Sequence, residues 1–326
     1  MSPHRLLRGA SAHPPARVRA SAPGGIGNLG PGLDVLGCAV TGLRDEVLAE
    51  WCEVDDVVVL DAGHPDLPTD PARHTSALAA SAVLRAVRAR GARLPAGIAI
   101  TASKRLPLSG GQGGSAASAV AGAAAANALL GDLLDDAALL ECCLVAEEAV
   151  AGRHLDNIAP ALLGGIVLVR ALDPIDIVRL PVPEGLRIVL AHPSQQLNTS
   201  DARRALPAHV PRATAVHQLA QVGAVVAACY AGDLALLGRA MDDRIAEPAR
   251  APLLPGFAQA KLAALEAGAL GASISGSGST SFALADDDDA AHDIGAAMRD
   301  AYNAHGIACT VRVTEIDTRG AIVEAA

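Results

Sequence analysis

The sequence predicts an α+β fold that is divided into two domains. Segments with helical periodicity and segments with strand-like alternation are mixed along the chain, without the strict β–α–β–α order of a parallel α/β sheet. The chain has 326 residues, which suits two domains of ordinary size. Apolar residues make up 51% and charged residues 19%, so the chain can bury a large core.

Residue periodicity places the elements of the first half. Strands are expected where apolar and polar residues alternate, and helices where apolar residues recur every three or four positions. Glycine follows two of the expected helices, at Gly91 and Gly131, where it suits a helix end. The patterns predict strands at 17–20, 35–40, 54–60, 97–102 and 164–169, and helices at 77–90, 115–130 and 137–150.

A segment dense in proline and charge, Asp173–Gly185, marks the expected domain boundary. It divides the chain into a loose basic tail at 1–16, an N-terminal domain at 17–175 and a C-terminal domain at 176–326. In the second domain the same periodicities predict strands at 186–192, 272–275, 280–285 and 308–313, and helices at 213–230, 234–241, 255–266 and 290–305.

The composition argues against nucleic-acid binding. The net charge is −9 and aromatics are only 2%, whereas such binding depends on Lys, Arg and aromatic stacking. The six cysteines form no C-x-x-C pair, so free thiols in a reducing cytosol are expected. The first residues show no apolar leader, and the most apolar run, 116–130, is too short to span a bilayer. We therefore expect a cytoplasmic protein without nucleic-acid or membrane partners.

The strongest local signal is a glycine-rich loop that leads at once into a helix, Pro107-Leu-Ser-Gly-Gly-Gln-Gly-Gly-Ser115-Ala-Ala-Ser118. Glycines let backbone N–H groups converge, and the helix N-terminus adds unpaired donors and positive partial charge. Together they make an anion site suited to phosphate. Ser115 lies in the first turn, within reach of a phosphate or a metal. The loop lacks the ending of a Walker A motif, and the structural alternative is a plain strand-to-helix turn.

Two other loops carry polar side chains in a glycine and proline frame. In Pro23–Asp34, the side chains of Asn28 and Asp34 would either orient a ligand or cap a turn. In Gly152–Gly165, His154 precedes an Asp-Asn pair, although a lone histidine is more often structural. Glu147, about two helical turns upstream, would either hold Mg²⁺ through its hard carboxylate or face solvent.

A fourth loop and two arginines complete the candidates. The loop Ser275-Gly-Ser-Gly-Ser-Thr280 lies between two expected strands, where it would either close over phosphates or form a plain hairpin. Arg203 and Arg250 carry the planar fork that binds carboxylates bidentately, although an isolated surface arginine is usually only solvated.

The order of the Gly-rich loops resembles that of the GHMP small-molecule kinases, over nearly the whole chain from about Val18 to Val313. The middle loop resembles their P-x-x-x-G-L-G-S-S-A-A motif. Within this superfamily, Asn28-Leu-Gly-Pro-Gly-Leu-Asp34-Val-Leu-Gly resembles the homoserine kinase signature N-L-G-x-G-F-D-x-[LF]-G, and His154-Leu-Asp-Asn157-Ile-Ala-Pro resembles H-x-D-N-V-A-P. The segments 199–207 and 247–250 also match that family.

This resemblance implies a fold, a reaction and cofactors. The fold would be the GHMP kinase fold, with an N-terminal domain like domain 2 of ribosomal protein S5 and a ferredoxin-like C-terminal domain. The protein would be a homodimer that uses ATP and Mg²⁺ to phosphorylate the side-chain hydroxyl of L-homoserine in threonine biosynthesis. The phosphates would lie on Pro107, Ser109, Gly110, Gly111, Gln112, Gly113, Gly114, Ser115, Ala116 and Ser118.

The resemblance also implies residue roles. Ser115 and Glu147 would hold the metal. Asp34 would act either as a general base or only as an acceptor that orients the hydroxyl. Lys104 would approach the phosphates, and the two arginines would clamp the substrate carboxylate. The substrate would be bound by Asn28, Asp34, His154, Asn157, Thr199, Arg203 and Arg250.

The sequence departs from the family pattern in places that bear on nucleotide binding. Gln112 replaces a usual Leu, and Gly114 replaces the first of two serines. His74 stands where many members have Asn near the adenine. The spacing to the His-x-Asp-Asn group leaves either Glu147 or Glu148 as the metal ligand.

Other functions stay open at this stage. A kinase for threonine or mevalonate would use the same scaffold, since mevalonate also carries a carboxylate and threonine differs from homoserine only by the placement of one methyl. A nucleotide-binding sensor without turnover is an alternative from a different class.

Overall fold

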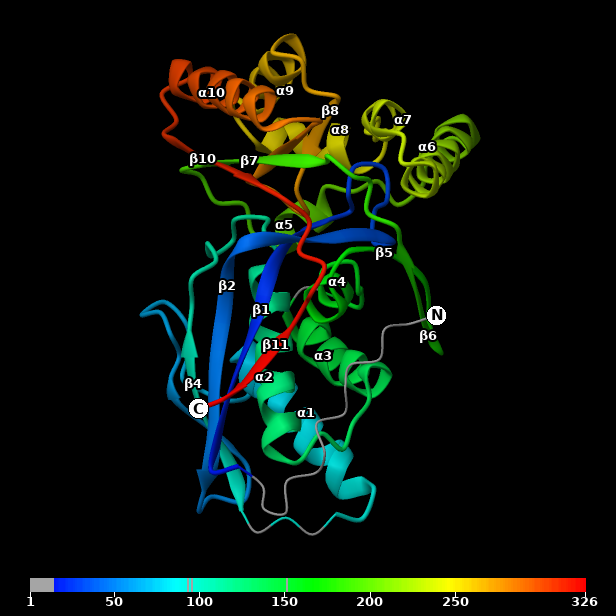
Figure 1. Cartoon of the computed structure of the whole chain (residues 1–326). Helices are drawn as coiled ribbons and strands as arrows, with labels where there is room; N and C mark the ends of the chain where they lie inside the picture. The colour runs from blue at the N-terminus through cyan, green and yellow to red at the C-terminus, as the bar shows by residue number, and fades with distance from the viewer. Residues whose placement is uncertain (1–14, 93, 95, 151) are drawn as a thin grey trace.

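The structure is a computed structural model that describes residues 15–92, 94, 96–150 and 152–326. Most of the basic tail predicted at 1–16 therefore lies outside the described residues. Figure 1 shows a lower unit built on a long sheet and an upper unit built on a shorter one. This mixture of sheets and helices confirms the α+β prediction.

The first sheet forms the lower unit. In the described residues its strands run in the order β11-β1-β2-β4-β3, with β5 and β6 continuing from β2. Neighbours are antiparallel except for the parallel pair β3 and β4. The strands are β1 (Arg17–Gly27), β2 (Leu36–Cys52), β3 (Val57–Asp61), β4 (Gly97–Ser103), β5 (Ile166–Leu172), β6 (Ile175–Leu180) and β11 (Ile322–Ala325).

Helices cover one face of this sheet, with α2 (Gly114–Leu129) at the centre. Its alanine-rich sequence keeps the side chains small, so α2 packs closely on α1 (Thr75–Ala89), α3 (Asp136–Val150) and strands β1 and β2. At Gly122 a Cβ would lie only 2.3 Å from the carbonyl oxygen of Ser76, so that contact requires glycine. The short helix α4 (Ile158–Leu163) completes this layer.

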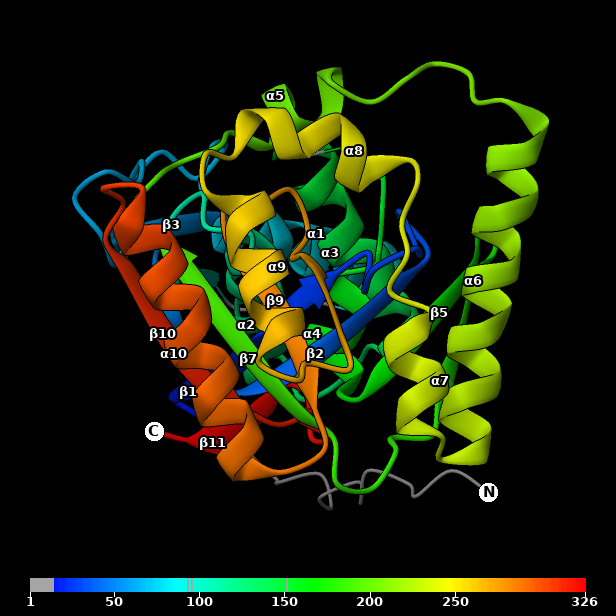
Figure 2. The ribbon, with the colours of Figure 1, turned by 90° about the horizontal axis from the view of Figure 1, so that it is seen from above.

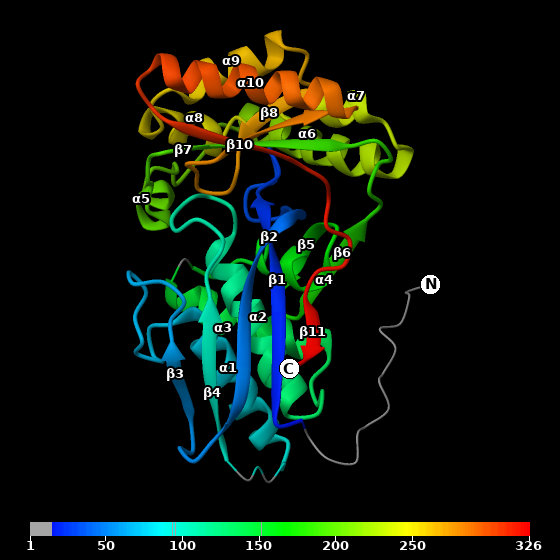
Figure 3. The ribbon, with the colours of Figure 1, turned by 60° about the vertical axis from the view of Figure 1, so that its left-hand side comes forward.

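The second sheet forms the upper unit, with the order β10-β7-β9-β8 in the described residues. Figure 3 shows α9 (Phe257–Glu266) and α10 (Asp288–Ala304) above this sheet, where Met298 and Tyr302 are buried against it. The strands are β7 (Arg187–Pro193), β8 (Gly271–Ile274), β9 (Ser281–Ala285) and β10 (Cys309–Thr314).

The other face of the second sheet packs onto the first unit. One apolar cluster contains Phe282 of the second sheet, Cys38 and Ile166 of the first, and Val225 of α6 (Arg212–Ala231). The adjacent helix α7 (Leu234–Arg239) contributes Leu237. This continuous core fixes the two units relative to each other, and loops from both meet beside it.

Several short elements were not predicted, because periodicity needs a longer window than they provide. They include α4, α5 (Thr199–Arg204) and α8 (Ala246–Arg250), which is followed by a turn of 3₁₀ helix at Ala251–Leu253. The predicted strand 17–20 is longer in the structure, where β1 continues to Gly27. The strand therefore includes the first part of the predicted glycine-rich loop. Across the described residues, none of the helices has the length and apolar character that crossing a membrane requires.

The predicted boundary between residues 175 and 176 falls within β6 (Ile175–Leu180), a strand of the first sheet. Asp173 and Pro174 form a tight turn between β5 and β6, and β6 pairs with β5 in the first sheet. The chain therefore leaves the first sheet only after Leu180. It also returns there, because β11 pairs with β1.

Candidate active site

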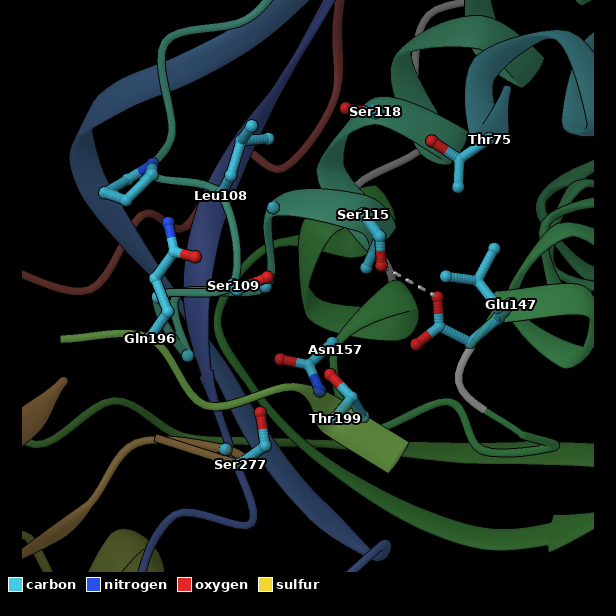
Figure 4. Close-up of a pocket in the computed structure, with 18 of the residues that line it drawn as sticks. Thr75, Leu108, Ser109, Ser115, Ser118, Glu147, Asn157, Gln196, Thr199 and Ser277 are labelled. Atoms are coloured by element: carbon cyan, nitrogen blue, oxygen red, sulfur yellow. Dashed lines mark hydrogen bonds between the residues drawn. The ribbon is translucent and has the colours of Figure 1, made fainter. Parts of the chain in front are cut away.

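A cavity of about 570 Å³ lies where the loops of the two units meet. Its wall combines backbone from glycine-rich loops with charged and hydroxyl side chains. Figure 4 shows Ser109, Ser115 and Glu147 on one side of it and Thr199 and Ser277 on another. Of the residues that the sequence analysis singled out as sites, the cavity is lined by Asn28, Asp34, Pro107, Ser109, Gly110, Gly111, Gly113, Gly114, Ser115, Ala116, Ser118, Glu147, His154, Asn157, Thr199, Arg203 and Arg250.

The phosphate-loop candidate ends at the N-terminus of α2. Gly113 precedes the helix with a φ of 67°, and the first turn of α2 contains no acidic residue. The amide groups of this turn therefore face the cavity as unpaired donors at the positive end of a 16-residue helix. This arrangement fits an anion such as phosphate.

The loop 275–280 supports the phosphate-loop candidate from the second unit. The Ser275 hydroxyl donates to the carbonyl of Gly111 (2.6 Å), and the backbone N–H of Thr280 donates to the carbonyl of Gly110 (3.1 Å). Gly111 has a φ of 72°, and a Cβ there would lie 2.5 Å from the Ser275 carbonyl oxygen. The two glycine-rich loops are thus packed backbone against backbone.

Gln112 is the one predicted phosphate contact that does not line the cavity. Its side chain is buried away from the cavity lining. The side-chain amide donates to the Thr280 hydroxyl (3.1 Å), and its carbonyl accepts from Arg312 (3.2 Å). Gln112 therefore links the two units through these two hydrogen bonds. A leucine at this position would leave Thr280 and Arg312 without that polar partner.

Beneath the loop lies a buried ion pair that the sequence analysis did not identify as such. The ammonium of Lys104 contacts the carboxylate of Asp45 and donates to the Gly114 carbonyl (2.7 Å) and the Ser118 hydroxyl (3.0 Å). Asp45 also accepts from the Ser118 hydroxyl (2.7 Å). Burial lowers the pKa of Lys104, and the nearby charge of Asp45 acts against that shift. The pair fixes the start of α2.

Replacing Asp45 by Asn should destabilise the protein, by about 2–3 kcal/mol. The amide keeps the shape but leaves the buried ammonium of Lys104 without a counter-charge. Urea unfolding measures the loss. Asp288→Asn is the matched control, because Asp288 forms an exposed pair with Arg187 and should change stability little. Equal effects of the two changes would contradict a structural role for the buried pair.

Ser115 and Glu147 face each other across the cavity wall. The Ser115 hydroxyl lies 3.4 Å from the Glu147 carboxylate, as the dashed line in Figure 4 shows. Glu147 is 4% exposed, and burial raises its pKa to about 7 although the nearby charge of His154 acts to lower it. Glu148 points elsewhere, since its carboxylate is 56% exposed and pairs with Arg153. Of these two neighbouring glutamates, Glu147 is therefore the one in the cavity.

The Asn28–Asp34 loop is held in an unusual backbone conformation. Asn28 and Asp34 have φ values of 66° and 61°, a region that asparagine and aspartate enter more readily than most residues. The Asn28 side chain accepts from the backbone N–H of Asp34 (3.1 Å) and donates to the Gly276 carbonyl (3.1 Å). Asn28 therefore acts as a turn cap in this structure, and it lines the cavity together with Asp34.

Asp34 and Arg203 form a bidentate pair within the cavity. The two guanidinium nitrogens of Arg203 lie 2.9 and 2.8 Å from the two carboxylate oxygens. Burial alone would raise the pKa of Asp34, but Arg203, with the charges of His154 and Arg250, lowers it below its usual 3.8. Arg250 is 3% exposed and donates to the Gly276 carbonyl (2.8 Å). Both arginines thus converge on the Asp34 side of the cavity.

His154 lies between two carboxylates. Its Nδ1 is 3.1 Å from Asp156 and 3.8 Å from Glu147. Burial acts to lower the pKa of His154, but the contact with Asp156 and the charge of Glu147 outweigh it and raise the pKa above 6.5. Asp156 also accepts from the backbone N–H of Asn28 (3.0 Å), so the His154-x-Asp-Asn157 group is joined directly to the Asn28 loop.

Sequence reasoning missed part of the cavity wall. Thr75, Gln196 and Ser277 also line it, and Figure 4 shows all three side chains around the opening. His74 lines it too, with its ring buried and its pKa lowered by burial. Ser277 belongs to the loop 275–280, and the family resemblance already pointed to His74. Thr75 and Gln196 lie just before or at the start of helices, where no residue pattern marks a site.

Comparison with known proteins adds an independent line of evidence. The family model for the GHMP kinase N-terminal domain matches residues 77–165, and that for GHMP kinases C terminal matches 225–304. A homoserine kinase of Chlorobium phaeobacteroides strain DSM 266 is 42% identical over 294 residues, covering 87% of this chain and 92% of the relative. One from Arabidopsis thaliana is 39% identical, covering 93% and 84%.

Solved structures point to the same family as the sequence matches. The crystal structure of homoserine kinase from Cytophaga hutchinsonii matches with a TM-score of 0.89 and 40% identity, covering 96% of this chain and 98% of that one. The crystal structure of L. major mevalonate kinase matches with a TM-score of 0.67 at 18% identity, which shows the shared fold alone. These matches agree with the loops that surround the cavity and with the order of those loops in the chain. The chain therefore belongs to the homoserine kinase family of the GHMP kinases.

Proposed function

We propose that this chain transfers the γ-phosphoryl group of ATP to the side-chain hydroxyl of L-homoserine, giving O-phospho-L-homoserine and ADP. The observation that carries the proposal is the cavity itself. At one end it offers the N-terminus of α2, and at the other it brings Arg203, Arg250 and Asp34 together. The names of the relatives, homoserine kinases at about 40% identity, support the same substrate.

The ATP phosphates are proposed to lie on the loop from Pro107 to Ser118. The geometry supports this because backbone donors of the loop and of the first turn of α2 face the cavity. Lys104 contributes positive charge from below, although its ammonium is already held by Asp45 and Ser118. We therefore assign Lys104 to shaping the loop. The adenine base of ATP would lie towards His74 and Thr75, at the cavity wall formed by the start of α1.

Magnesium is proposed to be held by Ser115 and Glu147. The residues fit this ion, since a hydroxyl and a carboxylate oxygen lie 3.4 Å apart and Mg²⁺ prefers oxygen ligands. A buried carboxylate whose pKa is raised to about 7 also gains from a cation beside it. When bound, the ion would neutralise charge on the transferring phosphoryl group.

The substrate is proposed to bind at the Asp34 end. Arg203 and Arg250 supply the forks that suit its carboxylate, and Thr199 lies at the cavity wall on the same helix as Arg203. Carboxylates at Asp34 and Asp156 suit its ammonium group. In this structure the Arg203 guanidinium is hydrogen-bonded to the Asp34 carboxylate. We therefore propose that the substrate carboxylate either shares the guanidinium with Asp34 or replaces Asp34 as its partner.

The chemistry then needs positioning more than covalent help. The hydroxyl oxygen forms a bond to the γ-phosphorus, the bond from that phosphorus to the β–γ bridging oxygen breaks, and the hydroxyl proton is released. The chain holds the two reactants in line and surrounds the developing charge with fixed backbone donors. Asn28 and Asp156 keep Asp34 in place through the hydrogen bonds described above.

An ADP-release assay with L-homoserine, L-threonine, mevalonate and galactose in parallel tests this function. Turnover should be strongest with homoserine. Stronger turnover with another compound would retain a small-molecule kinase and reject the proposed arrangement of the arginines. ATP binding without turnover on any of them would favour the sensor alternative. We place the reaction in the cytoplasm, in the route to threonine, on the basis of the family resemblance.

A further inference from the structure

One buried amide side chain stands in a helix that is otherwise largely apolar. Between Arg212 and Asp233 the chain contains no Asp, Glu, Lys or Arg, and most of the residues are Ala or Val. Within this stretch of α6, Gln218 is only 8% exposed. Burying an amide costs free energy unless its donors and acceptor are paired, so the partners of Gln218 indicate what it does.

The Gln218 side chain joins two segments that are far apart in the sequence. Its nitrogen donates to the Pro31 carbonyl (2.7 Å) and to the Asp243 carboxylate (2.8 Å). Its oxygen accepts from the backbone N–H of Arg244 (3.1 Å). Figure 2 shows the chain passing close to α6 on its way from α7 to α8. The amide therefore holds the loop before β2 on one side and the segment between α7 and α8 on the other.

The first of these segments carries Asp34. Pro31 lies shortly before it, in a loop with several positive φ values. At Gly30 of this loop a Cβ would lie 2.7 Å from the Sδ atom of Met241, so the loop packs tightly on the residues that follow α7. The hydrogen bond to the Pro31 carbonyl therefore fixes the Asp34 loop at a place where its packing leaves little room for movement.

The second segment carries Arg250. The Asp243 carboxylate accepts from the backbone N–H groups of residues 245, 246 and 247, at 2.8, 3.1 and 2.7 Å. It thus satisfies free donors at the start of α8, and Arg250 is the last residue of that helix. Because α8 has only five residues, whatever fixes Asp243 also fixes the position of Arg250.

A shared acceptor joins the two segments again at the cavity. The Gly276 carbonyl accepts from the Asn28 side chain (3.1 Å) and from Arg250 (2.8 Å). The Asp34 loop and α8 are therefore held together both at Gly276, which lines the cavity, and at Gln218. Gln218 is not one of the described residues that line the cavity, so it acts on a bound molecule only through the residues that it holds.

We propose that Gln218 is a positioning residue for the substrate, which sets the separation between the Asp34 carboxylate and the Arg250 guanidinium. The inference rests on the proposed function, in which these two groups contact opposite ends of the amino acid. Its hydroxyl and its carboxylate are joined by a short chain, so a small change in the separation weakens both contacts. None of the hydrogen bonds of Gln218 involves the loop Pro107–Ser118, so ATP binding does not depend on it.

Initial rates of Gln218→Met, with homoserine and ATP varied in turn, test the proposal. Methionine keeps the length of the side chain but forms none of its three hydrogen bonds. The value of kcat/KM for homoserine should fall by about 10- to 10²-fold, the scale of effect expected for a displacement of about 1 Å, while KM for ATP stays close to the parental value. An equal rise in KM for both substrates would indicate general damage and overturn the proposal.

Gln221→Met is the matched control. Gln221 lies on the same helix and is half-buried, and its side chain forms no hydrogen bond within the described part of the chain. This variant should keep the parental kcat and both parental KM values. A loss equal to that of Gln218→Met would show that α6 tolerates no change, and the role assigned to Gln218 would then be wrong.

A double variant tests whether Gln218 acts through Arg250. If it does, adding Gln218→Met to Arg250→Lys should cost less in kcat/KM than Gln218→Met costs alone, because the clamp that Gln218 positions is already impaired. Fully additive losses would mean that the two residues act independently, which contradicts the proposal.

Hydrogen exchange of the free protein tests the link without any substrate. In Gln218→Met the backbone N–H groups of Asp34 and of residues 244–247 should exchange faster than in the parent, while those of α2 keep parental rates. Parental exchange in both segments would overturn the proposal. Gln218→Asn, whose amide ends one methylene short, should give the same pattern and replaces the methionine variant if that one does not fold. A parent without turnover on homoserine would reject the proposed function, and the exchange rates would still decide whether Gln218 holds the two segments.

Discussion

Replacing Asp34 by Asn is expected to lower kcat/KM for L-homoserine by about 10²-fold or more, within the range of about 10²–10⁴-fold that acid–base and orienting groups contribute. Asp34 is the carboxylate on which Arg203 closes, and its backbone is fixed by the Asn28 side chain. The change removes the negative charge that holds Arg203 and replaces one of the two acceptor oxygens beside the substrate with a donor. Initial rates over a range of homoserine concentrations measure the effect.

The control for this change is Asp201→Asn. Asp201 lies on the same short helix as Arg203, but its side chain is 40% exposed and pairs with Arg204. Its replacement should leave kcat and KM close to the parental values. A comparable loss in both variants would indicate damage to α5 rather than a role for the Asp34 carboxylate.

The size of the loss also separates a general base from an orienting acceptor. Arg203 lowers the pKa of Asp34, so its carboxylate is a weak base, and we expect it to orient the hydroxyl. If Asp34 and Arg203 act as a unit, Asp34→Asn combined with Arg203→Gln should be no worse than the poorer single variant. A loss beyond about 10⁴-fold for Asp34→Asn, with fully additive effects, would instead indicate a base.

Glu147→Gln should lower kcat by roughly 10²- to 10³-fold, which is about 3–4 kcal/mol of transition-state stabilisation. The amide keeps the contact with Ser115 but removes the negative charge that the proposed metal site requires. Glu148→Gln is the control, since Glu148 is the exposed neighbour that pairs with Arg153. If Glu148→Gln caused the larger loss, the assignment of the metal to the cavity side of α3 would be wrong.

The same carboxylate predicts how magnesium dependence varies with pH. The pKa of Glu147 is raised to about 7, so its neutral form gains population as pH falls below 7. A metal ligand must be deprotonated, and protons therefore compete with Mg²⁺ below that pH. The Mg²⁺ concentration for half-maximal rate should rise on the acid side of 7 in the parent. In Glu147→Gln it should change little with pH, and a parallel rise there would contradict the assignment.

How much of this site the sequence predicts depends on how local each interaction is. The loop before α2 is a contiguous run of glycines, so its anion-binding geometry follows from neighbouring residues. The pairing of Asp34 with Arg203 joins residues 169 positions apart, and resemblance to a family suggested only that both touch substrate. The ion pair of Asp45 and Lys104 was not predicted, because Asp45 stands among other charged residues between two expected strands, and the middle of the long strand β2 falls there.

The fold shows the same division. Long helices such as α2 and α10 follow from periodicity, and they were predicted. The allocation of β6 and β11 to the first sheet depends on which distant strand they pair with, and no local pattern contains that information. Gln112 illustrates the reverse case: it stands in a recognisable motif, but its side chain pairs with Arg312 of the second unit and does not line the cavity.

The return of β11 to the first sheet has a consequence for synthesis of the chain. β1 leaves one edge of that sheet unpaired until residues 322–325 are available, and the whole second sheet lies between them in the chain. Domains usually fold in order as they emerge from the ribosome, and open strand edges invite association with other chains. Here the N-terminal unit cannot complete its edge until the second sheet has been translated. Nascent chains of this protein should therefore depend on chaperones until β11 is released.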